Sequence, residues 1–318
     1  MSGRKFIVSG SPHIHACDSV KSRMWSVVIA LLPALAFSVY AFGLGALLVV
    51  VTSVIGCVLT EFLIQKYMIG GEMTISNGSA VITGLLLALN LPSNLPLWIV
   101  LIGCIVAIGL GKFAFGGLGQ NIFNPAILGR VFLLISFPSQ MTTWPLPMVN
   151  RMNYADATTG ATILGKIKMG ELSPENLDIW ATFIGDMGGS LGETCAIALL
   201  LGGVFLLLRG VISWHIPVSV ISSVAVFSWL AGINPIVSIL TGGVLLGAIF
   251  MATDYVTSPM THKGMVLYGV MIGIITMIIR LWGAYPEGVS FAILIMNGFT
   301  PLINKFMKPR RFGERRFN

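Results

Sequence analysis

The residues best suited to chemistry in this sequence form a short polar stretch, Asp156 to Thr162, with the pattern D-x-x-T-G-A-T. This stretch lies in the only long hydrophilic interruption of an otherwise apolar chain. Gly160 and Ala161 leave little side-chain bulk in front of Thr162, and glycine permits backbone angles that other residues avoid. The Thr162 hydroxyl is therefore a candidate acceptor for a phosphoester delivered by a transferase. The alternative is a surface turn that is rich in small polar residues.

Composition predicts that membrane helices position this stretch. The chain has 318 residues, of which 55% are hydrophobic and only 10% are charged, and its mean hydropathy is +0.89. A soluble domain carries about 25% charged residues. Several apolar runs approach the roughly 20 residues that a helix needs to cross a bilayer. The first 23 residues are rich in charged and histidine side chains, so no cleavable signal peptide is visible. The fold class expected is an all-α polytopic membrane protein.

Ten membrane segments are predicted, five on each side of a long polar loop. The third is short and ends near Pro92, which cannot sit inside a continuing helix. The fifth follows Asn124-Pro125, and proline suits the first position of a helix. The predicted segments are 24–41, 44–64, 79–91, 95–110, 126–137, 193–208, 216–230, 235–251, 264–282 and 288–303. The chain thus divides into an N-terminal segment, a first membrane half, a loop, a second membrane half and a basic tail, at 1–23, 24–137, 138–191, 192–304 and 305–318.

The distribution of positive charge predicts the orientation. If the N-terminus is cytoplasmic, ten crossings return the basic C-terminal tail to the cytoplasm. The loop 138–191 is then external, and it is net acidic, with five Asp or Glu residues against three Lys or Arg residues. The remaining cytoplasmic turns carry Lys66, Lys112, Arg209 and Lys263. Positive charge lies inside, as the rule for membrane proteins requires. The net charge of +7 therefore indicates topology, not binding to nucleic acid.

A faint internal repeat relates the two halves. Thr83-Gly84, followed by leucines, recurs as Thr241-Gly242, 158 positions later. Asn124-Pro125 has a looser echo in Thr300-Pro301. Because five segments is an odd number, two such halves must be inverted relative to each other. Inverted five-helix repeats with short interrupted helices are typical of transporters, whose sites lie where the halves meet. The alternative is that Thr-Gly-Leu strings arise by chance in apolar sequence.

Three motifs together carry a family resemblance. They are the D-x-x-T-G-A-T stretch, the N-terminal SGSPHIH run at 9–15 with Asp18-Ser19-Val20, and GQNIFNPA at 119–126. The chain resembles, over essentially its whole length, the D subunit of the Rnf ion-translocating ferredoxin:NAD oxidoreductase. It is similar also to the B subunit of the sodium-translocating NADH:quinone reductase. The compact length, with no large N-terminal extension, favours the D subunit.

The resemblance implies two flavins. It implies that a flavin transferase attaches FMN to Thr162 through a phosphoester, with Asp156, Thr159, Gly160 and Ala161 completing the motif. It also implies a non-covalent riboflavin within the membrane part, and other subunits as partners, including an external flavinylated subunit. Ile163 stands where proline is half expected. That difference affects the shape of the loop and not the phosphoester.

Four other charged residues lie in or near the predicted membrane segments, and each has one or two expected roles. Arg130 is expected either to contact a flavin phosphate or carbonyl, or to extend its head to the cytoplasmic interface. Asp254, beside several hydroxyl side chains, is either an oxygen ligand for a cation such as sodium or part of a polar turn. Glu61, near a segment end, is expected to be solvated or paired. Arg280 is expected to be an interfacial anchor.

Two functions fit this sequence. The first is a flavin-carrying subunit that transfers electrons and is coupled to sodium or proton translocation. The second is a channel or secondary transporter for a small solute, without flavin, since a fold does not fix a function. The D-x-x-T-G-A-T stretch separates them, because a passive channel has no use for it. No dinucleotide-binding G-x-G-x-x-G follows a strand, so other chains are expected to handle NAD and ferredoxin.

Overall fold

A computed structural model describes most of the chain, namely residues 19–70, 75–147, 159–160, 162–169, 179–185, 188–283 and 287–308. The N-terminal SGSPHIH motif, Asp156, Ala161 and the last ten residues lie outside the described residues, and so does the side chain of Thr159.

The first membrane half contains five helical segments. Each begins or ends where the sequence supplies a breaker: Gly43 separates the first two, and Asn90 follows the third. The Asn124 side chain accepts hydrogen bonds from the backbone N–H groups of Ala126 and Ile127, at 3.1 and 3.4 Å, which confirms the predicted helix start at Pro125. The segments are α1 (Val20–Phe42), α2 (Leu44–Ile64, prolonged by a π turn at Gln65–Ile69), α3 (Ser79–Leu89), α4 (Leu97–Ile105, prolonged at Val106–Leu110) and α5 (Pro125–Ser136).

The second membrane half repeats this order with one helix broken. An Asn-Pro pair starts a helix here too, because Asn234 caps the helix that begins at Pro235. The predicted counterpart, Pro301, lies inside a helix instead. The segments are α9 (Ala196–Leu208), α10 (His215–Leu230), α11 (Pro235–Leu240), α12 (Val244–Leu246, prolonged at Gly247–Met251), α13 (His262–Trp282) and α14 (Val289–Phe306).

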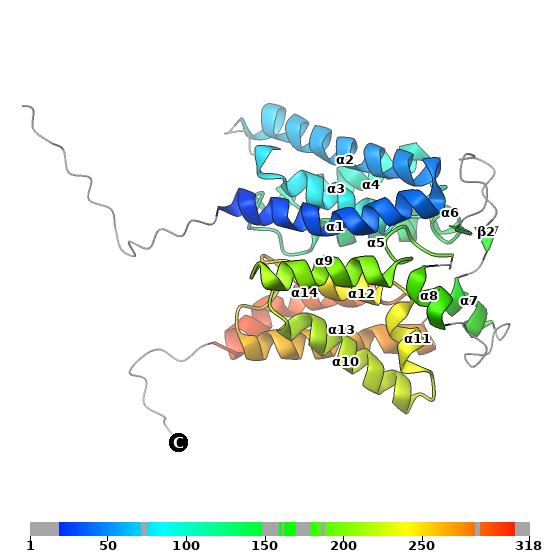
Figure 1. The fold of residues 1–318 in the computed structure, drawn as a ribbon. Helices are drawn as coiled ribbons and strands as arrows, with labels where there is room; N and C mark the ends of the chain where they lie inside the picture. Colours follow the sequence, from blue (N-terminus) through cyan, green and yellow to red (C-terminus); the bar gives the residue numbers. More distant parts are fainter. Residues whose placement is uncertain are drawn as a thin grey trace, which may run out of the picture.

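The segment between the halves carries short elements at one end of the molecule (Figure 1). A two-residue pairing joins β1 to β2 in antiparallel register, with Trp144 opposite Gly160. The short helix that begins directly after Thr162 belongs to this group. The elements are α6 (Pro138–Met141), β1 (Trp144–Pro145), β2 (Thr159–Gly160), α7 (Ile163–Lys168) and α8 (Ile179–Ile184).

Helical segments lie at all ten predicted positions, so the chain is a mostly helical integral membrane protein. Five of them are long and apolar enough to cross a bilayer: Val20–Phe42, Leu44–Ile69, Leu97–Phe115, His262–Trp282 and Val289–Phe306. The others are shorter, or broken as in α11 and α12. The count of ten crossings and the inverted relation between the halves stay predictions.

The two predicted interruptions have different outcomes. The eighth segment, predicted to run through 235–251, is broken at Thr241-Gly242-Gly243, as the interrupted-helix interpretation expected. Thr83-Gly84 is not an interruption, because α3 is continuous there. Gly84 instead allows close packing on α2, since a Cβ at this position would lie 2.9 Å from the Ser53 carbonyl oxygen. The prediction at Thr83-Gly84 was wrong because a Thr-Gly pair also suits tight helix contacts.

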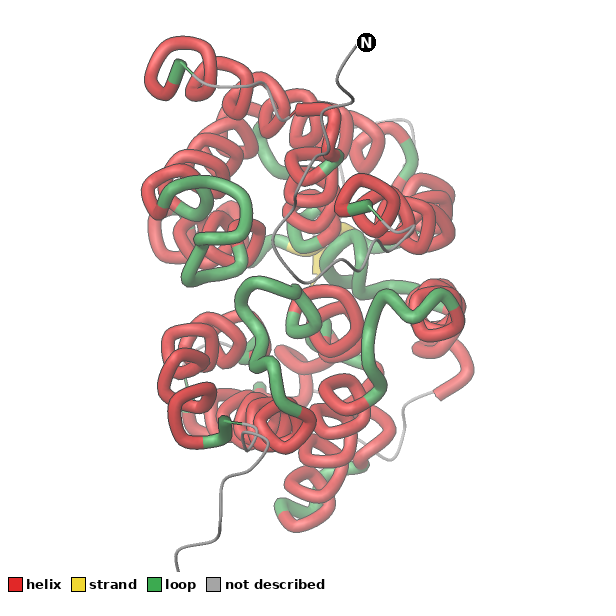
Figure 2. Tube along the Cα trace, turned by 90° about the vertical axis from the view of Figure 1, so that its left-hand side faces the viewer, coloured by secondary structure: helices red, strands yellow, loops and turns green. Residues whose placement is uncertain are grey.

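The two halves pack as an upper and a lower group of helices (Figures 1 and 2). Helix α1 lies along α9, and α5 contacts α14, so equivalent helices meet at the junction. Within each half the second helix packs on the fourth, α2 on α4 and α10 on α13. A continuous buried core of aliphatic side chains joins the groups. The junction is therefore a packed interface in which buried polar groups need partners.

The described ends of the chain lie together. The beginning of α1 and the end of α14 are at one end of the bundle, and α6, β2 and α7 are at the other (Figure 1). We predict that the first end is cytoplasmic. A cysteine replacing Met169, which is 60% exposed after α7, should react with an impermeant maleimide in intact cells, in a Cys17→Ser background. A cysteine replacing the exposed Lys308 should react only after permeabilisation. The opposite pattern would reverse the orientation.

Candidate functional site

Thr162 lies directly before α7 and caps that helix. Its backbone is extended, and its hydroxyl oxygen accepts a hydrogen bond from the Gly165 N–H at 3.1 Å. A threonine in this position satisfies one of the N–H groups that the start of a helix leaves without a partner. The residue is only 6% exposed, whereas its small neighbours predicted an open hydroxyl. The start of α7 therefore covers most of this residue.

Helix α7 rests on the second membrane half. Leu164 contacts the backbone of Gly242, because a Cβ added to that glycine would lie 2.6 Å from the leucine Cδ1. At the other end of α7, the Lys168 ammonium donates to the Gly283 carbonyl oxygen. The segment that carries Thr162 is thus seated on the break between α11 and α12.

The break itself depends on two glycines and one arginine. Gly242 and Gly243 have φ angles of 68° and 69°, in the left-handed region that glycine adopts without a steric penalty. The Arg280 guanidinium donates to the carbonyl oxygens of Ser238, Thr241 and Gly242, at 2.6, 2.7 and 3.3 Å. These carbonyls stand at the end of α11, where a helix leaves its acceptors without partners. Arg280 is only 8% exposed, so its prediction as an interfacial anchor was wrong.

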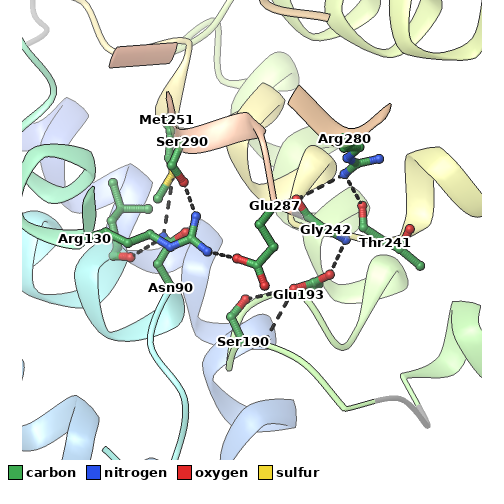
Figure 3. A network of polar contacts seen from close by, with 11 residues as sticks. Asn90, Arg130, Ser190, Glu193, Thr241, Gly242, Met251, Arg280, Glu287 and Ser290 are labelled. Carbon is green, nitrogen blue, oxygen red and sulfur yellow. Dashed lines mark hydrogen bonds and ion pairs between the residues drawn. The ribbon is translucent and has the colours of Figure 1, made fainter. Parts of the chain in front are cut away.

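Two buried carboxylates complete this network (Figure 3). Glu193, in the turn before α9, accepts from the Gly242 N–H and from the Ser190 hydroxyl, the latter at 3.2 Å. Glu287, just before α14, forms an ion pair with Arg130 of α5. Charged groups on both halves therefore converge at the junction, near the end of the bundle that carries α7.

Arg130 does not take one of the two positions expected for it. It is buried, and its guanidinium donates to Glu287 and to the Ser290 hydroxyl, so it does not extend to the cytoplasmic interface. That part of the prediction was wrong because the partner carboxylate is 157 residues away in the sequence. A contact of Arg130 with flavin stays a prediction.

A second buried ion pair lies in the first half. The Lys112 ammonium is 2.7 Å from a Glu61 carboxylate oxygen and 2.7 Å from the Ser79 hydroxyl, and all three residues are buried. Glu61 is therefore paired, which was one of its two expected states. Lys112 and Arg280 each follow or end the fourth helix of their half and contact the third segment, Lys112 at its start and Arg280 at its break.

A large pocket lies where the loop before α5 meets the loop after α12. It encloses about 840 Å³ including its mouth, and most of its walls are apolar. Its polar lining includes Ser79, Thr83, Asn121, Asn124 and Asp254. Asp254 accepts from the Thr257 hydroxyl at 3.2 Å, and burial raises the pKa of its carboxyl above the ordinary value. No group of three or more His, Cys, Asp or Glu residues gathers here or elsewhere among the described residues.

Sequence reasoning missed most of the buried network. Lys112 was assigned to a cytoplasmic turn, Glu193 only marked the start of a segment, and Glu287 received no role. Each of these charges stands at the end of an apolar segment. Charged groups near a membrane span are costly unless they are paired or functional, so their positions were a usable signal. The partners could not be named, because they lie far apart along the chain.

The comparisons with known proteins agree along the whole length. The model of the NQR2, RnfD, RnfE family matches residues 7–313. The chain is 49% identical to the D subunit of the Na⁺-translocating ferredoxin:NAD⁺ oxidoreductase complex of Acetobacterium woodii, covering 98% of this chain and 97% of the relative. It is 44% identical to the D subunit of the proton-translocating complex of Clostridium ljungdahlii, covering 98% and 97%. It is 40% identical to the D subunit of an ion-translocating oxidoreductase complex of Stutzerimonas stutzeri, covering 93% of each. The chain belongs to the NQR2, RnfD, RnfE family.

Proposed function

We propose that this chain is the D subunit of an Rnf-type ferredoxin:NAD oxidoreductase and that it passes electrons through flavin, coupled to ion translocation. The observation that carries the proposal is the full-length similarity to proteins named as this subunit, in a chain that also holds the D-x-x-T-G-A-T stretch. The alternative of a flavin-free channel has no comparable support. One relative is named for sodium and another for protons, so the proposal covers ion translocation without assigning the ion.

FMN is the group we propose for Thr162, attached through a phosphoester by a flavin transferase that reads Asp156, Thr159, Gly160 and Ala161. FMN supplies the ability to accept and release electrons, and the protein holds and tunes it. Two features of the structure fit this group: the threonine oxygen stands at the start of α7, and the buried cation Arg280 contacts the break on which α7 rests. The test is in-gel flavin fluorescence of the denatured, purified chain. A chain without fluorescence after coexpression with the transferase would refute the proposal.

The pocket around Asp254 is our candidate for the second, non-covalent flavin. It combines mostly apolar walls with a few convergent polar groups, as cofactor sites usually do. A flavin ring presents N–H and C=O groups along one edge. The carboxylate of Asp254 offers an acceptor for such an N–H group, and the Asn121 amide is a further polar group in the lining. These residues come from both halves, so a flavin here would lie at their junction.

Asp254 therefore has two proposed roles that one variant separates. If the carboxylate holds the second flavin, Asp254→Asn should at least halve the non-covalent flavin released by acid denaturation, because it removes a charged acceptor. FMN on Thr162 should stay unchanged. The released flavin is measured by chromatography, with Ser258→Ala in the same turn as control. Full flavin content with lost sodium stimulation of ferredoxin:NAD activity would instead assign Asp254 to the ion path.

The proposed partners follow from the same assignment. The relatives are named as subunits of a complex, so other membrane subunits and an external flavinylated subunit are proposed to contact this chain. Electrons from cytoplasmic ferredoxin would cross other subunits to reach the external flavins and return inward through this chain. Any group that couples this transfer to ion movement must bind the ion differently in the two redox states.

A further inference from the structure

A second cavity lies beside the helix that follows Thr162. It encloses about 690 Å³ including its mouth and lies between α7, the loop before α11, α11 itself and the end of α13. One wall is formed by α7 itself, and the opposite wall by the broken helix and the end of α13. The lining includes Leu164, Ile167, Lys168, Val237, Met277 and Arg280.

The chemistry of this cavity is unusual for a surface hollow. Its lining is almost entirely apolar, and the two charged residues in it, Lys168 and Arg280, are both cations. Arg280 is buried and fixed by three carbonyl oxygens, and its Nε has no hydrogen-bond partner among the described residues. The carboxylates of Glu193 and Glu287 interact electrostatically with this guanidinium, but neither of them lines the cavity. An apolar slot with a rigid cation in its wall suits a flat aromatic ring that acquires negative charge.

We propose that this cavity receives the isoalloxazine ring of the FMN on Thr162, and that Arg280 stabilises the reduced, anionic form of that ring. The inference rests on the proposed function, and it adds the location of the ring and the residue that tunes it. Thr162 directly precedes α7, and Leu164, two residues after it, already lines the cavity.

The charge balance gives Arg280 a definite effect. Taking up two electrons and one proton leaves one negative charge on a flavin ring. The electrons come from ferredoxin through the complex, and the proton comes from solvent. In a water-poor cavity, a nearby cation lowers the free energy of the charged form much more than it would in water. A guanidinium already held by three carbonyls has little reorganisation to undergo, as in other preorganised charge sites. Arg280 should therefore raise the reduction potential of the covalent flavin.

The first test is a redox titration of the covalent flavin in the purified complex. Arg280→Gln should shift the midpoint to more negative potential, lowering the ratio of reduced to oxidised flavin at least tenfold, which is about 30 mV for a two-electron couple. Arg280→Lys should lie closer to the wild type. The matched control is Lys166→Gln, which removes a cation of α7 that does not line the cavity. An unchanged potential in Arg280→Gln, or an equal shift in Lys166→Gln, would overturn the inference.

The second test fills the cavity and does not depend on Arg280. Val237 is buried in its wall, whereas the preceding residue, Ile236, is half exposed on the outside of α11. Val237→Trp should displace the ring, so that iodide quenches flavin fluorescence more strongly than in the wild type. Ile236→Trp should not change the quenching. Equal quenching in both variants would overturn the inference.

Failure of the inference and failure of the proposed function are distinguishable. Every variant is first checked by in-gel fluorescence for flavin that survives denaturation. If the wild-type chain carries none, the proposed function fails. If all variants carry it but neither the potential nor the quenching responds, only the location of the ring and the role of Arg280 fail.

Discussion

Replacing Thr162 by alanine should abolish the covalent flavin proposed for this chain and, with it, the proposed electron transfer from ferredoxin to NAD. Alanine has no hydroxyl, so no phosphoester can form at this position. The expected result is complete loss of in-gel flavin fluorescence, with no FMN on the tryptic peptide by mass spectrometry. Thr158→Ala should keep both signals. FMN found on Thr158 or Thr159 would contradict the assignment.

The structure adds a control that the motif alone does not suggest. Thr162 caps α7, and loss of a helix cap costs roughly 0.5–2 kcal/mol, so an alanine could act by loosening the helix. Asparagine caps helices well but offers no alcohol, whereas serine offers both a cap and an alcohol. Thr162→Asn should therefore lose the flavin and keep the helix, and Thr162→Ser should keep both. A flavin on the asparagine variant would show that attachment is elsewhere.

The positions of the helices could be predicted from the sequence because apolar runs and breakers act locally. Pro92 and Asn124-Pro125 determine helix ends through the backbone of their own neighbourhood. The break in the eighth segment is also a local effect, because Gly242 and Gly243 adopt left-handed φ angles at the break itself. The failure at Thr83-Gly84 shows the limit of this reasoning. A glycine in an apolar run serves equally for a break or for close helix packing, and only the neighbouring helix decides.

The buried network could not be predicted, because its contacts depend on the packing of distant segments. Arg280 follows an apolar run, and an interfacial anchor is the usual role of such a residue. Its actual role depends on α11 ending beside it, about 40 residues earlier in the sequence. Glu193 and Arg130 are similar cases, since each finds its partner in another element. For the candidate flavin site, the sequence could therefore propose Thr162 and, as one of two interpretations, Arg130, but neither cavity nor the role of Arg280.

Removing Lys112 should destabilise the membrane part severely. Glu61 is completely buried beside it, so Lys112→Met would leave a carboxylate with its main counter-charge gone. Breaking a buried pair from one side typically costs about 3–5 kcal/mol, mostly because the remaining charge is uncompensated. We expect Lys112→Met to reduce the yield of monodisperse protein several-fold and to lower its melting temperature in detergent. Both are measured by fluorescence-detected size-exclusion chromatography after heating.

The double variant separates the charge from the packing. Replacing both partners by apolar groups of similar volume is often neutral or even stabilising. Lys112→Met combined with Glu61→Met should therefore recover much of the melting temperature lost by Lys112→Met alone. Lys263→Met, which removes an exposed lysine, should stay close to the wild type. If Lys112→Met melts like the wild type, or if the double variant is worse than either single one, the pair does not stabilise this half by charge compensation. Recovery of stability without recovery of ferredoxin:NAD activity would show in addition that the pair serves electron or ion transfer, beyond its contribution to folding.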